Sequence, residues 1–234
     1  MVPPLRATSS SLGLLEWEYV LAIALVSIGM DVVTGYAGRI TLGSRRLDGA
    51  PAHMVARWGI ARTFQTPKLV PRGTALDNVL LGADRLAPCS DIDAVFRTRR
   101  GRAAGQMATE YALACLEMVG GGAYAEVRAG ELPHGTQRLV EVARGIASTA
   151  RYLLLDEPMA GLSTGEGEAL EQTLRACTRL GLAIVVIEHN VPFVLRVAER
   201  ITVLENVRVL AEGTPEELAA DTGVAQRPVV RDVT

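Results

Sequence analysis

Residues 151–158 read Arg-Tyr-Leu-Leu-Leu-Asp-Glu-Pro, and this stretch decides the fold class. A short apolar run that ends in Asp156 and Glu157 is typical of a buried strand that delivers two carboxylates to its C-terminal tip. In nucleotide-hydrolysing α/β folds, such a pair holds Mg²⁺ and polarises the attacking water. A solvated strand end is the common alternative for a lone Asp-Glu pair, so the rest of the chain must discriminate between them.

The element that usually accompanies such a strand is a Gly-x-x-x-x-Gly-Lys-Ser/Thr loop, which cradles the phosphates. The chain has no such loop. It contains a single lysine, Lys68, and no glycine pattern leads into it. The run Gly38-Arg-Ile-Thr-Leu-Gly43-Ser44 imitates the glycine spacing, but Ser44 stands where the lysine belongs. The chain alone is therefore a doubtful ATPase.

Composition excludes some classes of function. Hydrophobic residues make up 49% of the 234 positions, enough for a sizeable core. The formal charge of −2 gives no basic face, so we expect no nucleic-acid partner. Cys89, Cys115 and Cys177 are scattered without CxxC spacing, which favours isolated reduced thiols over a metal site.

The N-terminus differs from the rest of the chain. Tyr19–Met30 is a run of twelve uncharged residues, whereas a bilayer-spanning helix needs about 20 mostly apolar ones. Acidic residues precede the run and no positive cluster abuts it, so it is a poor signal peptide. We expect an apolar N-terminal helix, either inserted in a membrane or buried in protein. A change of composition near residue 44 sets the first predicted boundary, with segments 1–44, 45–222 and a frayed tail at 223–234.

Downstream, helical and strand patterns alternate. Helical spacing covers Leu76–Asp84 and Ala108–Val119, with Thr98–Arg102 as a solvated bend between them. A third helix is predicted at Thr136–Ala147. Further elements follow in order: a helix capped by Ser163, an apolar strand at Leu182–Ile187, a helix at Val191–Ala198, paired strands at Ile201–Leu204 and Arg208–Ala211, and a helix starting at Thr214. The prediction is an α/β fold with a mainly parallel sheet, helices on both faces, and a helical subdomain at about 75–130.

Three other residues are candidates for chemistry, although each has an ordinary alternative. His189 closes the second apolar strand, where a parallel neighbour of the Asp156 strand would bring it to the same sheet edge. Gly135 precedes a helix start, whose backbone N–H groups suit an anion. Gln65, in Arg-Thr-Phe-Gln, carries no signal by itself. A surface imidazole, an ordinary helix start and a loop amide are the common interpretations.

Taken together, these motifs resemble the ATP-binding cassette of ABC transporters over roughly residues 46–220. The resemblance rests on Gln65, Leu132-Pro-His-Gly-Thr-Gln-Arg138, Tyr152–Pro158, Ala160-Gly-Leu-Ser163 and His189, in that order. Gly59-Ile-Ala-Arg-Thr-Phe-Gln65, Leu132-Pro-His-Gly135 and Gly213-Thr-Pro-Glu-Glu217 look most like the ATP-binding subunits of branched-chain amino-acid importers.

The resemblance implies a role for each motif. Asp156 would be the magnesium carboxylate of the Walker B strand, Glu157 the catalytic base and His189 the switch histidine. Gln65 would be the Q-loop glutamine, which meets Mg²⁺ and couples to the membrane subunit. The residues that would contact ATP are Gln65, the signature motif (Leu132, Pro133, His134, Gly135 and Thr136) and Ser163 of the D-loop. ATP and Mg²⁺ are thus the implied cofactors. A second ATP-binding subunit and transmembrane permease subunits are the implied partners, at the cytoplasmic face of the plasma membrane.

The departures from the family pattern matter equally. Residues 19–44 resemble the early transmembrane part of the same importers' permease subunit, so the cassette looks truncated, without its first strands and phosphate loop. A gene-level deletion, a decayed gene and an assembly error all fit this pattern. Thr136 replaces the usual Gln or Glu, and Ser163 the usual Asn or Asp. Three hypotheses follow: an energy-coupling ATPase subunit, a non-hydrolysing donor of half a nucleotide site, and a non-functional fusion fragment.

Overall fold

The computed structural model describes residues 21–26, 33–36, 39–42, 45–47, 49–86, 98–205 and 208–220. The chain divides into two compact units. Unit one comprises residues 1–58 and 183–234, and unit two comprises residues 59–182. The predicted bounds 1–44, 45–222 and 223–234 stay a prediction, and the tail from 223 lies outside the described residues.

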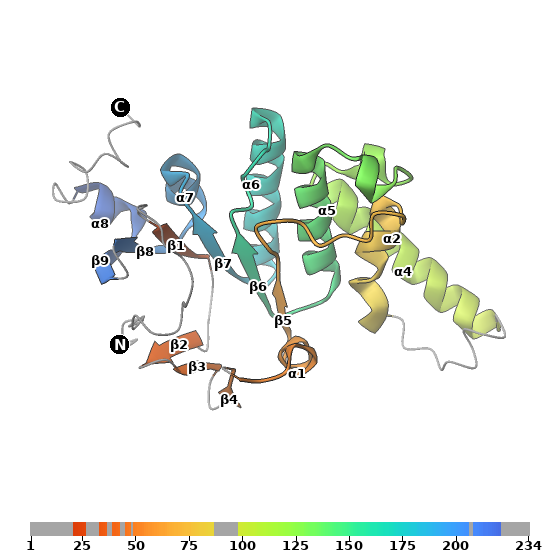
Figure 1. Ribbon diagram of the computed structural model, residues 1–234, viewed down its shortest axis with the longest axis horizontal. Coiled ribbons are helices and arrows are strands. Elements are labelled where there is room, and N and C mark those ends of the chain that lie inside the picture. Colours follow the sequence, from red (N-terminus) through yellow and green to blue (C-terminus); the bar gives the residue numbers. More distant parts are fainter. Residues whose placement is uncertain are drawn as a thin grey trace. The chain divides into compact units, whose positions relative to one another are not determined.

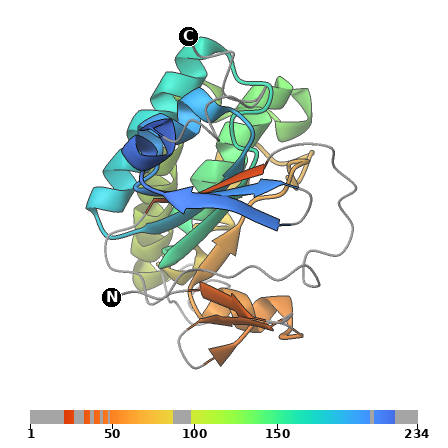
Figure 2. The same ribbon diagram turned by 90° about the vertical axis from the view of Figure 1, so that its left-hand side faces the viewer.

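Unit two is built around two parallel strands, β5 (Ile60–Arg62) and β6 (Tyr152–Asp156), which run side by side (Figures 1 and 2). Ile60 pairs with Tyr152 and Arg62 with Leu154. The helices of this unit are α2 (Ala75–Leu80), η1 (Ala83–Arg85), α4 (Arg99–Met118), η2 (Gly122–Tyr124), η3 (Ala129–Glu131), α5 (His134–Ala147) and α6 (Thr164–Arg179). The predicted strand at Asp156 and the helix after Ser163 are confirmed. The helical subdomain at about 75–130 stays a prediction as a domain, although its described residues include α2, α4, η2 and η3.

The core of the helical part forms where α2, α4 and α5 pack against one another (Figure 1). Val79, Leu116 and Leu139 contribute one fully buried side chain from each helix. The predicted bend at Thr98–Arg102 was wrong, because these residues form the N-cap and first turn of α4. The Thr98 side chain accepts a hydrogen bond from the Gly101 N–H at 3.1 Å and so caps the N-terminus of this helix.

Unit one contains a four-stranded arrangement in the order β7 (Ala183–Glu188), β1 (Leu21–Val26), β8 (Arg200–Glu205) and β9 (Arg208–Gly213). Each neighbouring pair of these strands is antiparallel. Three short strands, β2 (Val33–Tyr36), β3 (Arg39–Leu42) and β4 (Arg45–Arg46), form a second sheet. The unit's helices are α1 (Ala52–Arg57), α7 (Val191–Val197) and α8 (Pro215–Ala220). The predicted strand at Leu182–Ile187, the paired strands and the last two helices are confirmed.

The apolar N-terminal helix was a wrong prediction, because Leu21–Val26 is a strand paired on both edges. An apolar run of this length fits a buried strand as well as a helix, and only the neighbours β7 and β8 discriminate between them. The rest of Tyr19–Met30 lies outside the described residues. The mainly parallel sheet is confirmed only for β5 and β6, since β1 runs against both of its neighbours. Among the helices of the described residues, none combines the length and hydropathy needed to cross a membrane.

Candidate functional site

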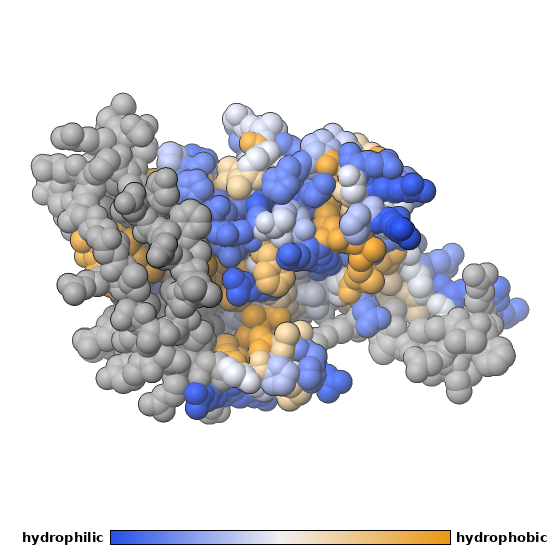
Figure 3. Space-filling model, viewed as in Figure 1, coloured by the Kyte–Doolittle hydropathy of each residue, from blue (hydrophilic) through white to orange (hydrophobic). Residues whose placement is uncertain are grey.

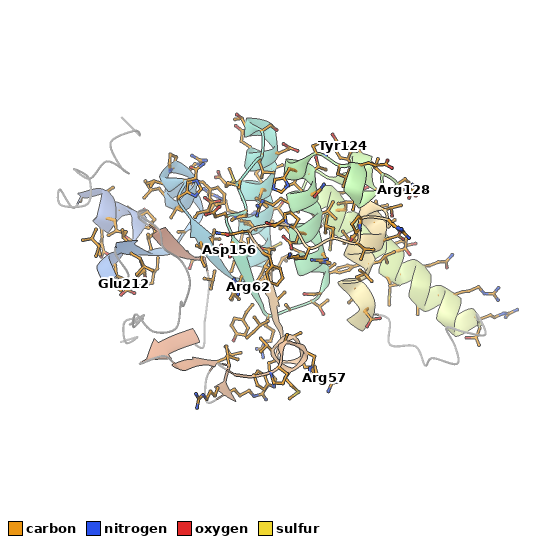
Figure 4. The ribbon with its side chains drawn as sticks, in the orientation of Figure 1. Arg57, Arg62, Tyr124, Arg128, Asp156 and Glu212 are labelled. Carbon is orange, nitrogen blue, oxygen red and sulfur yellow. The ribbon has the colours of Figure 1, made fainter. Side chains whose placement is uncertain are left out.

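The carboxyl ends of β5 and β6 bring Arg62 and Asp156 together. The Arg62 Nη2 atom lies 3.4 Å from Asp156 Oδ2, and Figure 4 shows both side chains at this end of the strands. The Arg62 guanidinium also lies 5.5 Å from the centre of the Phe64 ring. The Asp156 side chain is 16% exposed, against 57% for Arg62, so the carboxylate is largely shielded while its counter-charge faces solvent. The pair is therefore open to exchange for another cation.

Two backbone contacts fix Asp156 in place. The Asp156 N–H donates to Thr63 Oγ1 at 3.1 Å, and the Thr63 N–H donates to the Leu154 carbonyl at 2.9 Å. The carbonyl of Asp156 is also bound, because Arg138 Nη1 donates to it at 3.2 Å. Because Thr63 and Arg138 are both buried, these bonds are sheltered from competing water.

Glu157 lies beyond the strand, in a left-handed conformation with φ of 47°. The sequence pattern predicted that one strand carries both Asp156 and Glu157 at its C-terminal tip, but β6 ends at Asp156. A non-glycine residue in this region costs about 1–2 kcal/mol. Such strain persists mainly at functional sites, where the surroundings enforce it.

Gln65 belongs to the irregular segment Thr63–Val70, which bends at Gln65 and Thr66 and which we call the Gln65 strap. The Gln65 side chain is exposed, whereas its carbonyl accepts a hydrogen bond from Arg138 Nη2. Arg138 Nη1 also donates to the Phe64 carbonyl at 3.4 Å. Gln65 thus presents its amide from a strap whose backbone is tied to α5.

Leu132–Thr136 leads into α5 and adjoins the loop Ala160–Ser163. The two segments meet at Gly135 and Gly161, which have no side chains to separate them. Thr136 Oγ1 lies 3.5 Å from Glu166 Oε1, and Glu166 Oε2 accepts hydrogen bonds from the Ser163 N–H at 2.8 Å and hydroxyl at 2.7 Å. The bond from the Ser163 hydroxyl holds the pKa of Glu166 below its usual value. Both predicted motifs therefore form one packed structure.

His189 belongs to unit one, directly after β7. Its side chain is 61% exposed, and its backbone N–H donates to the carboxylate of the buried Glu188 at 3.1 Å. The same carboxylate accepts from the Asn190 N–H at 3.2 Å. Glu188 therefore orders the turn that carries His189. The other predicted site residues, Gln65, Leu132–Thr136, Asp156, Glu157 and Ser163, all belong to unit two.

Sequence reasoning gave no role to four residues that shape the site: Arg62, Thr63, Arg138 and Glu141. The Glu141 carboxylate accepts hydrogen bonds from the Phe64 N–H at 3.4 Å and the Lys68 N–H at 3.1 Å. A signal existed for Arg138 and Glu141, which recur at helical spacing beside the apolar positions Leu139 and Val142. Charged residues so close to an apolar face are candidates for burial, paired with an opposite charge or a hydrogen-bond partner. Nothing in the pattern marked Thr63, because its role depends on a strand from elsewhere in the chain.

The oxygen donors of this region would suit a magnesium ion whose remaining ligands are water molecules and phosphate oxygens. Mg²⁺ prefers one or two carboxylates together with waters and phosphate oxygens, and Asp156 and Gln65 offer oxygens of this kind. In the described part of the chain, no group of three or more His, Cys, Asp or Glu side chains is arranged to hold a metal ion.

Comparison with known proteins identifies the class. A family model described as ABC transporter matches residues 24–160, more than half of the chain. The chain therefore belongs to the ABC transporter family, as an ATP-binding subunit.

Its relatives include two bacterial proteins named as high-affinity branched-chain amino acid transport ATP-binding proteins. BraF of Pseudomonas aeruginosa is 34% identical over 193 residues, which cover 80% of this chain and 76% of BraF. LivG of Salmonella typhimurium is 33% identical over 223 residues, covering 92% of this chain and 88% of LivG.

Solved structures agree on the fold. The ADP conformation of MJ1267, an ATP-binding cassette of an ABC transporter, matches with a TM-score of 0.61 and 26% identity, covering 80% of this chain and 74% of that one. The dimeric structure of MJ0796, a bacterial ABC transporter cassette, matches with a TM-score of 0.62 and 26% identity, over 76% of this chain and 73% of that one.

Proposed function

We propose that this chain serves an importer of branched-chain amino acids as an ATP-binding, energy-coupling subunit. The observation that carries the proposal is the junction of Asp156, Arg138 and the Gln65 strap at the ends of β5 and β6. The names of BraF and LivG support the class of transported substrate. A cassette does not contact the transported amino acid, so its own residues do not identify that amino acid.

In this proposal the side chains keep the roles that the family pattern implies. Asp156 and Gln65 bind Mg²⁺, Glu157 is the catalytic base, and His189 senses the γ-phosphate. Leu132–Thr136 and Ser163 contact nucleotide on a second cassette. Permease subunits would hold the pair at the cytoplasmic face of the plasma membrane. Val70 on the strap and Leu81 at the C-cap of α2 are exposed apolar side chains that such a partner could cover. Figure 3 shows hydrophobic surface in the area of α2.

ATP binding by the chain alone should be weak. A phosphate loop contributes several charge-assisted hydrogen bonds, each worth about 1.5–3 kcal/mol. Without them, affinity falls by orders of magnitude, since every ~1.4 kcal/mol is a factor of ten. Arg62 is an exposed cation at the ends of these strands, but one guanidinium replaces only part of that cradle.

The direct test is a titration of the purified chain with a fluorescent ATP analogue, with and without Mg²⁺. Asp156→Asn and Glu157→Gln serve as matched variants, because each removes one charge without changing volume. Micromolar, Mg²⁺-dependent binding that Asp156→Asn abolishes would show that the chain holds nucleotide by itself. Absence of saturation at millimolar analogue would limit the chain to acting on a partner's nucleotide.

The second candidate is a non-hydrolysing donor of half a site to a partner cassette. The packing of Leu132–Thr136 against Ala160–Ser163 favours it, because this surface is formed without any phosphate loop. The chain would then raise the ATPase rate or nucleotide affinity of a purified partner cassette, and Gly135→Arg would cancel that effect. An unchanged partner in the presence of excess chain would refute this role.

The remaining hypothesis is a non-functional fusion fragment in which residues 1–44 derive from a permease. The family match already begins at residue 24, which favours a cassette origin for residues 24–44. Flotation of the whole chain with membrane vesicles, which keeps the apolar run Tyr19–Met30, tests whether the N-terminus inserts in a membrane. Failure of the whole chain to unfold cooperatively in urea would favour the fusion hypothesis over both functional ones.

A further inference from the structure

The Gln65 strap is fixed by its backbone, although most of its side chains face solvent. Phe64, Gln65, Thr66 and Lys68 are exposed, and only Thr63 is buried. A surface loop of this kind usually leaves its backbone groups to water, and its amides exchange readily. Here the backbone groups of Phe64, Gln65 and Lys68 bind side chains of helix α5 instead.

Glu141 is the centre of this attachment. Its Oε2 accepts the Phe64 N–H at 3.4 Å, and its Oε1 accepts the Lys68 N–H at 3.1 Å. Arg144 donates to the Lys68 carbonyl at 2.7 Å and to Glu141 Oε1 at 3.4 Å. Arg138, Glu141 and Arg144 are spaced by three residues, so they share one face of the helix. One carboxylate thus spans the strap on both sides of Gln65.

Holding a carboxylate in this position is costly. Glu141 is 1% exposed, and burial raises its pKa above the usual range. An apolar residue would pack α5 against its neighbours without that desolvation cost. Leu139, Val142 and Ala143 already supply fully buried packing on this helix. The charge at position 141 therefore contributes to something other than the apolar core, and the strap amides are its partners.

We infer that Glu141 is a positioning residue, which fixes the backbone on either side of Gln65 so that the Gln65 amide is presented from a rigid strap. Gln65 is then attached to α5, the helix that begins at His134 within the Leu132–Thr136 segment, as well as to β5. The inference uses the proposed function only for the task of Gln65 at a nucleotide. The attachment itself is a property of the chain without nucleotide.

Amide hydrogen exchange on the whole chain, read residue by residue by NMR, tests this attachment. Glu141→Leu should increase exchange at Phe64 and Lys68 by about tenfold or more, the effect of losing one hydrogen bond. Glu141→Gln has one acceptor oxygen and one donor NH₂ group. Arg144 holds the oxygen near Lys68, so exchange should rise at Phe64 and remain slow at Lys68.

Two controls show whether a change in exchange is confined to the amides that Glu141 binds. The Thr63 amide, which bonds to the Leu154 carbonyl, should keep its exchange rate in each variant. Glu110→Gln, at an exposed position on α4, should change none of these amides. If Glu141→Leu does not fold, the exchange rates of Glu141→Gln test the inference without it. Unchanged exchange at Phe64, or an equal rise at Thr63, would overturn the inference. The measurement needs no nucleotide, so its failure differs from failure of the ATP titration.

Discussion

Gly135 and Gly161 are in direct backbone contact. A Cβ atom on Gly135 would lie 2.4 Å from the Gly161 carbonyl oxygen. Gly161 itself has φ of 77°, a conformation that favours glycine. The contact joins the start of α5 to the loop after β6. The segments Leu132–Thr136 and Ala160–Ser163 are therefore packed backbone against backbone.

Gly135→Ala should therefore destabilise the protein by about 1–3 kcal/mol, because a methyl group at 2.4 Å forces the backbone apart. Urea unfolding measures the change. The matched control is Gly105→Ala on α4, where a new Cβ meets nothing within 4 Å. That variant should gain about 0.5–1 kcal/mol from helix propensity. Equal effects of the two substitutions would contradict the close contact.

Thr63→Val should expose the Asp156 amide to exchange. Valine keeps the shape of threonine but removes the hydroxyl that accepts the Asp156 N–H, and an unpaired buried donor costs about 1–3 kcal/mol. Amide exchange at Asp156 should rise at least tenfold in Thr63→Val. Thr63→Ser retains the acceptor and should leave this amide protected. Equal exchange in both variants would show that the hydroxyl contributes nothing.

Ser163→Ala should destabilise the chain by about 1 kcal/mol, because it removes the capping box at the start of α6. The effect depends on pH. The Ser163 hydroxyl lowers the pKa of Glu166 from its ordinary 4.5, so this stabilisation is complete above that value. It is lost as pH falls through the folded-state pKa. In urea unfolding from pH 7 to pH 3, the difference between wild type and Ser163→Ala should shrink towards the acid end. What remains there is the pH-independent bond that the Ser163 hydroxyl accepts from the Glu166 N–H. A difference that stays constant with pH would exclude the linkage.

Glu157→Gly should be more stable than Glu157→Ala by about 1 kcal/mol, because φ of 47° is unfavourable for any residue with a Cβ atom. The same pair at Glu168, an exposed position on α6, should show the opposite order, since glycine weakens a helix by a similar amount. Thermal unfolding of the four variants compares them. The same order at both positions would contradict strain at Glu157.

The sequence alone determined the elements whose signals are local. The apolar run to Asp156, the cap at Ser163 and the proline start of α8 each depend on a few neighbouring residues, and each element formed as predicted. The family could also be predicted, because its motifs are short and ordered. The predictions of Gln65, Asp156 and Leu132–Thr136 as site residues depend on the same order of motifs and stay predictions.

Only the tertiary structure decided features that depend on residues far apart in the chain. Leu21–Val26 is a strand because β7 and β8 supply hydrogen-bond partners on both edges, which no local pattern encodes. Glu141 and Arg138 became part of the site because a strap more than seventy residues earlier offers its backbone to them. Local propensity is set by neighbours in sequence, whereas burial of a charge or a central strand is set by neighbours in space.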